Sequence, residues 1–191
     1  MFYSFLEWLG GLGPAAGSFV GTVTGWFLGL LALVGGALFN AHLNRRRDDR
    51  LRQVERRSVA VALKAELVGF RRQLVTNAEG LKSNKADFLA PCMSDYIKIM
   101  PQVLSKIGLL DVECIHDTVK AYALMEEHEG RLLLMGGKAS NDVGIGQRLI
   151  LMPVNRSEYV AGMNMSMVKS LDVAIERLDK EIQASGKAPK A

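Results

Sequence analysis

The sequence predicts an all-α protein in which one N-terminal transmembrane helix continues into an antiparallel helical bundle. Three observations predict this fold: an uncharged apolar run over residues 19–39, an arginine cluster just after it, and helical spacing of apolar residues beyond. We expect five segments. They are an interfacial segment (1–13), a transmembrane helix (14–42), a basic stalk (43–57), a helical bundle (58–184) and a disordered tail (185–191).

The apolar run over residues 19–39 contains no charged side chain. As a helix it is about 31 Å long, close to the thickness of the hydrocarbon core of a bilayer. Pro14 suits a first helical turn, so the helix is expected to begin there. A cleaved signal peptide is disfavoured, because the first 18 residues carry no Lys or Arg and the apolar run is too long.

Basic side chains follow the run and none precedes it: Arg45, Arg46, Arg47, Arg50 and Arg52. The positive-inside rule then predicts a single-pass protein of the bacterial inner (plasma) membrane, with its N-terminus outside and its C-terminal domain in the cytoplasm. In the segment before the run, Trp8 is expected to anchor at the outer membrane interface.

Small residues recur along one face of the predicted span: Gly17, Gly21, Gly25 and Gly29, continued by Ala32 and Gly36. Three overlapping GxxxG repeats start at Gly17, and such a face lets another helix approach closely. We interpret it as a helix-packing surface, either for a second copy or for a different membrane protein. The alternative is that glycine is simply common in transmembrane helices.

No proline occurs between Ala41 and Lys82, so one long helix is expected to leave the membrane and continue to Lys82. Two further helices are expected, one starting after an N-cap at Asp111 and one after a capping box formed by Asn155 and Glu158. Residues 83–110, with two prolines, predict short helical pieces. The run 149–152 predicts a brief strand or a buried extended piece, which alone cannot form a sheet.

Motifs for chemistry are weak in this chain, and we expect no enzyme, no cofactor and no metal site. Glu113 and His116 have the spacing of half a di-iron site, but no second copy of the motif exists. The run Glu126–Glu129, which includes His128, is expected to be a solvated face. Met163, Met165 and Met167 are expected to pack in a core, and Cys92 and Cys114 to be buried reduced thiols.

A pattern around the second helix is carried by Tyr96, by Lys106–Asp111 and by Val119 with Ala121 and Tyr122. It resembles uncharacterised bacterial single-pass membrane proteins that have a cytoplasmic helical domain. The resemblance covers about residues 58–180 and the anchor. It implies the fold given above and brings no activity with it.

We therefore expect a non-enzymatic accessory or scaffold subunit, whose partners are the lipid bilayer and another transmembrane helix. Nucleic acid is excluded as a partner, because residues from Ser58 onward carry 17 Lys and Arg against 16 Asp and Glu. Two alternatives stay open: a pore-forming or membrane-perturbing homo-oligomer, and a membrane-tethered helical sensor with a pocket between its long helices.

Overall fold

A computed structural model describes residues 14–83, 85–140 and 148–186, apart from the side chains of residues 14–17 and 20. The chain divides into two compact units, Met1–Leu51 and Arg52–Ala191, and each is described by itself. The all-α prediction is confirmed. The predicted segment 1–13 and residues 187–191 of the predicted tail (185–191) lie outside the described residues, while residues 185 and 186 of that tail are helical.

The first described element is the helix α2 (Pro14–Lys82), which begins and ends at the predicted residues. Within the second unit its buried face is Val59, Ala60, Leu63, Leu67, Phe70, Leu74 and Ala78. A second stripe of apolar residues on α2 has the same helical spacing and includes Val54 and Val61. This second stripe is exposed. Two apolar stripes with the same spacing therefore have different environments, and only one of them belongs to the core.

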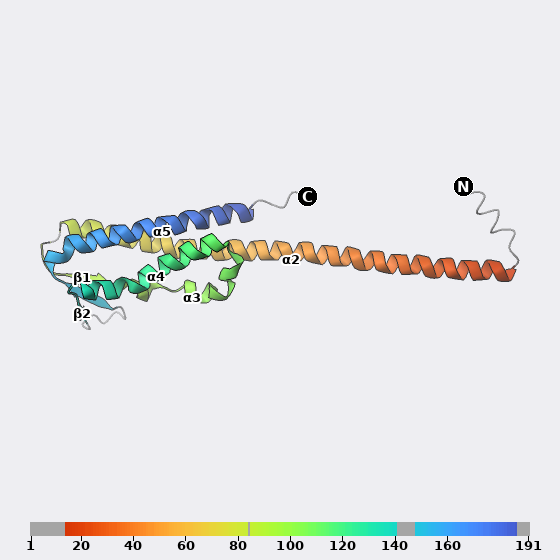
Figure 1. Ribbon diagram of the computed structural model, residues 1–191, viewed down its shortest axis with the longest axis horizontal. Helices are drawn as coiled ribbons and strands as arrows, with labels where there is room; N and C mark the ends of the chain where they lie inside the picture. The colour runs from red at the N-terminus through yellow and green to blue at the C-terminus, as the bar shows by residue number, and fades with distance from the viewer. Residues whose placement is uncertain (1–13, 84, 141–147, 187–191) are drawn as a thin grey trace. The chain divides into compact units, whose positions relative to one another are not determined.

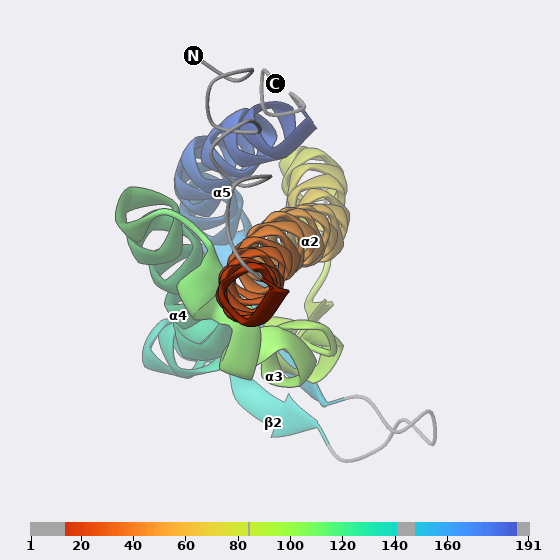
Figure 2. The ribbon, with the colours of Figure 1, turned by 90° about the vertical axis from the view of Figure 1, so that its right-hand side faces the viewer.

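The helices α4 (Val112–Leu134) and α5 (Ser157–Gly186) pack against the second half of α2 (Figures 1 and 2). Glu181, near the end of α5, accepts hydrogen bonds from Arg56 of α2 and from the backbone N–H of Asp111, just before α4. These contacts make α5 antiparallel to both helices, as the bundle prediction requires. They also make α4 run parallel to α2, which the predicted antiparallel bundle did not include.

The strand at Leu149–Met152, β3, is the centre of a small sheet that lies at one end of the bundle. It pairs antiparallel with β1 (Phe88–Pro91) on one side and with β2 (Lys138–Ser140) on the other. The strand prediction for residues 149–152 is confirmed, while its two partners were not predicted. Each partner is so short that its sequence shows no strand periodicity.

The return from α2 to α4 is made of short pieces, as predicted. They are a 3₁₀ helix at Met93–Tyr96, α3 (Met100–Val103) and a second 3₁₀ helix at Leu104–Leu109. Asp111 is the N-cap of α4, because its carboxylate accepts from the N–H of Glu113 at 3.2 Å. The capping box at Asn155 is not formed, since Val154–Arg156 is a 3₁₀ helix and α5 begins at Ser157.

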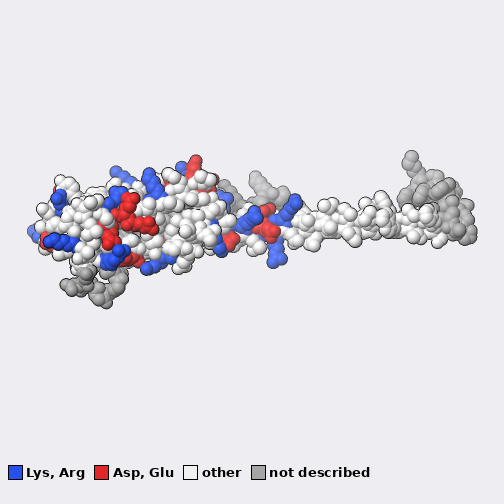
Figure 3. Space-filling view, turned by 60° about the horizontal axis from the view of Figure 1, so that its bottom comes forward, with Lys and Arg blue, Asp and Glu red and all other residues white. Residues whose placement is uncertain are grey.

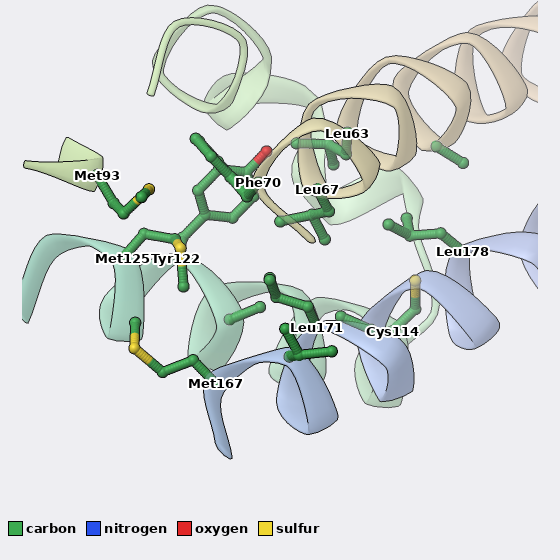
Figure 4. Close-up of a cluster of buried hydrophobic side chains, with 14 of the residues drawn as sticks. Leu63, Leu67, Phe70, Met93, Cys114, Tyr122, Met125, Met167, Leu171 and Leu178 are labelled. Atoms are coloured by element: carbon green, nitrogen blue, oxygen red, sulfur yellow. The ribbon is translucent and has the colours of Figure 1, made fainter. Parts of the chain in front are cut away.

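The core of the second unit has two clusters. The larger lies between α2, α4 and α5 and contains Leu63, Leu67, Tyr122, Met125 and Leu171 (Figure 4). The smaller lies beneath the sheet and contains Leu132, Ile150 and Met152. Met167 and Met163 pack in the core as predicted, whereas Met165 is 41% exposed.

The carboxylate of Glu66 fixes the return segment against α2. It accepts hydrogen bonds from three successive backbone N–H groups, of Lys98, Ile99 and Met100, at 2.6, 2.7 and 3.2 Å. The hydroxyl of Tyr122 donates to the same carboxylate at 2.6 Å. Burial and then this bond raise the pKa of Tyr122, so the phenol stays protonated and remains a donor.

Two glycines end α4 in a Schellman motif. The N–H of Gly137 donates to the carbonyl of Leu132, and the N–H of Gly136 donates to that of Leu133. Gly136 has φ +91°, which disfavours any residue with a side chain. A Cβ on Gly137 would lie 2.4 Å from a side-chain carbon of Ile150, so only glycine lets the sheet close over the end of this helix.

We expect Glu66→Gln to lower the free energy of unfolding by about 2 kcal/mol, because a charged acceptor is replaced by an amide with its own donors. Native-state hydrogen exchange at the amides of Lys98, Ile99 and Met100 measures the effect. The control is Glu79→Gln, on the same helix at an exposed position. Equal protection in both variants would contradict the role of Glu66.

We expect Gly137→Ala to lower the free energy of unfolding by about 2 kcal/mol, because the added methyl group collides with Ile150. Gly130→Ala is the matched control within α4. Nothing lies within 4 Å of its added Cβ, so the same substitution there should stabilise the helix by up to about 1 kcal/mol. Thermal unfolding followed by circular dichroism should shift in opposite directions for the two variants.

Candidate membrane-spanning and helix-docking site

The first unit contains, in its described part, the beginning of α2, which is an apolar segment followed by most of the arginine cluster. This helix is long and apolar enough to cross a membrane, and none of its most apolar stretch is buried by the described part of the chain. Figure 3 shows the segment as uncharged surface that ends at the arginine cluster. Side chains such as Phe19, at 70% exposed, and Leu33, at 72%, have no cover from the rest of the chain.

The predicted packing face is open at each of its described positions. A Cβ built on Gly21, Gly25, Gly29 or Gly36 would have no neighbour within 4 Å, and Ala32 is exposed. Gly17 is helical, but its surroundings lie outside the described residues. The face can therefore receive another helix without any rearrangement of the described chain.

One polar side chain within this segment has an internal partner. The hydroxyl of Thr22 donates to the carbonyl of Ser18 at 2.9 Å, one helical turn earlier. This bond satisfies the hydroxyl within its own helix. The segment therefore needs no second polar group to satisfy Thr22 in an apolar environment.

The arginines predicted to set the membrane topology lie on the exposed surface of α2. Arg45, Arg46, Arg47, Arg50 and Arg52 are all exposed, and none forms an ion pair with a described residue. Trp8 lies outside the described residues. Arg56, a few residues further on, has a different environment: it pairs with Glu181 at 2.6 Å and belongs to the bundle.

The half di-iron motif has ordinary ion-pair partners. Glu113 pairs with Arg177 at 2.7 Å, and His116 lies 3.2 Å from its neighbour Asp117. Among the described residues, no group of three His, Cys, Asp or Glu side chains is placed to hold a metal ion.

Both cysteines are buried and unpaired, as the sequence predicted. Burial raises the pKa of each thiol to about 11. The thiols of Cys92 and Cys114 therefore stay protonated near neutral pH, the form that is a poor nucleophile and a poor metal ligand.

The prediction for His128 was wrong: it does not lie on a solvated face but is 1% exposed. Its Nε2 lies 3.3 Å from the amide oxygen of Asn164, which is 2% exposed. Its Nδ1 has no hydrogen-bond partner among the described residues. The sequence did hold a signal, because Ala121, Met125, His128 and Leu132 share the helical spacing of the buried face.

Comparison with known proteins gives no match: no family model, curated protein or solved structure matches this chain.

We expect the stability of the chain to fall below about pH 6.5 because of His128. Burial, together with the nearby charge of Arg131, lowers the pKa of His128 from its ordinary 6.5, despite an opposing effect of Asn164. The folded state then favours neutral imidazole. The contribution of His128 to the stability of the fold is complete above its pKa in the unfolded chain, which is about 6.5. This contribution is lost as the pH falls from there toward the lower pKa of the folded chain.

Urea unfolding at pH 7.5 and at pH 5.5 measures this effect, with a limiting slope of about 1.4 kcal/mol per pH unit. His128→Gln should flatten the dependence on pH. His116→Gln is the control for the loss of an imidazole, because the side chain of His116 is 73% exposed, and an equal effect of both substitutions would contradict the role of His128.

Proposed function

We propose that this chain is a non-enzymatic, membrane-anchored accessory or scaffold subunit, which docks through α2 in the membrane and through its helical bundle in the cytoplasm. One observation carries the proposal: a helix segment of membrane-spanning length whose described apolar side chains are all exposed. Exposing that much apolar surface to water is costly, so a bilayer or a partner must cover it.

The arginine cluster supports the proposed orientation. Arg45, Arg46 and Arg47 follow the apolar segment directly, and they have no ion-pair partners among the described residues. Free guanidinium groups at this position favour retention on the cytoplasmic side and contact with anionic headgroups, worth about 1 kcal/mol each. The bundle would then lie inside the cell and the N-terminus outside, in the inner membrane of a bacterium.

The docking part of the proposal rests on the glycine face. In a bilayer, lipid tails are as apolar as leucine side chains, so burial of apolar surface does not by itself bring helices together. Close backbone approach adds dispersion and weak Cα–H···O contacts, and it requires small residues along one face. Gly21, Gly25 and Gly29 supply such a face and meet nothing within the chain.

The second unit offers an uncovered surface of its own on α2. Val54 is 68% exposed and Val61 is 47% exposed, and Ala65 is exposed between flanking charged side chains. The partner helices α4 and α5 cover the other side of α2, where Leu63 and Leu67 are fully buried. This stripe supports docking of a partner on the cytoplasmic side as well.

We expect replacement of Gly21 and Gly25 by Ile to weaken assembly in the membrane at least tenfold, because the branched side chains hold a neighbouring helix away. Crosslinking of the full-length chain in mild detergent, with mass analysis of what co-purifies, measures assembly. The mass also distinguishes a second copy from a different protein.

Ala37→Ile is the control. Ala37 is also exposed and lies in the same span, but about 130° away from the centre of the glycine face. It should leave assembly unchanged while adding the same side chain. Assembly that survives the change of Gly21 and Gly25, or that is lost equally in the control, would rule out docking through this face.

A further inference from the structure

A groove lies at the end of the bundle where α2 reaches the sheet, and it has a volume of about 260 Å³. Its walls include Asn77 and Leu81 of α2, Phe88 and Leu89 of β1 and Val160 of α5. His128 and Asn164 also line it, and they are the two most deeply buried polar side chains around it. The volume corresponds to about nine water-sized groups, which is the size of a small organic molecule.

The polar groups of this groove have unused hydrogen-bonding capacity. In the tautomer of His128 that carries its proton on Nε2, the oxygen of Asn164 accepts this bond, and its side-chain NH₂ then has two donors and no described acceptor. Nδ1 of His128 also has no described partner. A buried polar group without a partner costs about 1–3 kcal/mol, so the folded chain keeps Nδ1 of His128 in this position at a cost to its own stability.

The edge of the sheet adds a backbone group to the same groove. Cys92 donates its N–H to the carbonyl of Arg148, so alternate residues of β1 face β3 with their hydrogen-bonding groups. In that register the N–H and carbonyl of Leu89 point to the free edge. Leu89 lines the groove, and the next outward position is Pro91, which has no N–H.

The lining carries no charged side chain in the described part of the chain. A charged molecule would therefore lose hydration on entering and find no opposite charge. A neutral molecule with one hydrogen-bond donor and one acceptor avoids this loss and can pair with the polar groups of the groove. Its carbonyl can accept from the NH₂ of Asn164, and its N–H can donate to the carbonyl of Leu89 or of Asn77, while Leu81, Phe88 and Val160 cover an apolar body.

We infer that this groove binds a neutral small molecule that combines a carboxamide group with an apolar body. The inference is independent of docking in the membrane. It gives the sensor alternative a definite ligand class, and Asn164 is the residue that we expect to distinguish ligands.

Three probes of nearly equal size test it: benzamide, benzoate and ethylbenzene. Each is titrated into the full-length chain in nanodiscs, and NMR follows the side-chain NH₂ signals of Asn164 and Asn77. Benzamide should give saturable shifts with a millimolar dissociation constant, as expected for a molecule of this size. Benzoate and ethylbenzene should bind at least tenfold more weakly, the first through its charge and the second through its lack of polar groups.

Two variants complete the test. Binding to Asn77→Ala is followed through the NH₂ signal of Asn164, and binding to Asn164→Leu is followed through that of Asn77. Asn164→Leu keeps the shape of the side chain and should weaken benzamide binding at least tenfold. Asn77→Ala, at a half-buried position on the rim, provides a variant that does not disturb the core and should weaken binding several-fold. Asn155→Ala is the control, because this exposed residue lies outside the groove, and it should change nothing.

Equal binding of all three probes would overturn the inference, because apolar partitioning alone would then explain it. Shifts that fail to saturate, or an affinity for benzamide that neither Asn164→Leu nor Asn77→Ala changes, would overturn it as well. None of these outcomes affects assembly through the glycine face, which the crosslinking experiment tests separately.

Discussion

The carboxylate of Glu66 holds together a segment that has no regular structure of its own long enough to be stable. The chain leaves the end of α2 and must travel back along the bundle before α4 can start, because α4 runs parallel to α2. Glu66 binds three consecutive N–H groups of that returning segment and the hydroxyl of Tyr122 on α4. One side chain thereby ties α2, the return segment and α4 to each other, and Glu181 does the same for α5 where the segment ends.

The helix α2 runs through both units, and its apolar side chains have opposite environments in the two. In the second unit α2 buries Leu63, Leu67 and Leu74 completely, against partners that the fold itself provides. In the first unit every described side chain is exposed, and the residues that would be buried in a soluble protein have nothing to pack against. The membrane anchoring that we propose would resolve this difference, since a bilayer is the solvent in which an apolar surface without a protein partner is stable. Small residues then determine how closely a second helix can approach.

Much of the fold followed from local physical rules, and the exceptions have identifiable causes. The helix α2 begins at Pro14 and ends at Lys82 as predicted, and Asp111 caps α4 as predicted. Periodicity could not decide between the stripe of Val54 and Val61 and that of Leu63 and Leu67, because both have helical spacing. It also could not find β1 or β2, since strands of four and three residues depend on a neighbour rather than on their own sequence. Of the candidate site, the positions of Gly21–Gly36 were predictable, while the groove beside Asn164 was not.

By itself, the sequence determined the apolar segment, its length, the arginines that follow it and the spacing of its glycines. These are properties of one continuous stretch of chain and of the helix it forms. Only the tertiary structure decided that His128 is buried beside Asn164, that α4 runs parallel to α2, and that Gly137 must have no side chain. Each of these depends on contacts between residues far apart in the sequence, and local pattern carries no information about which distant group will be there.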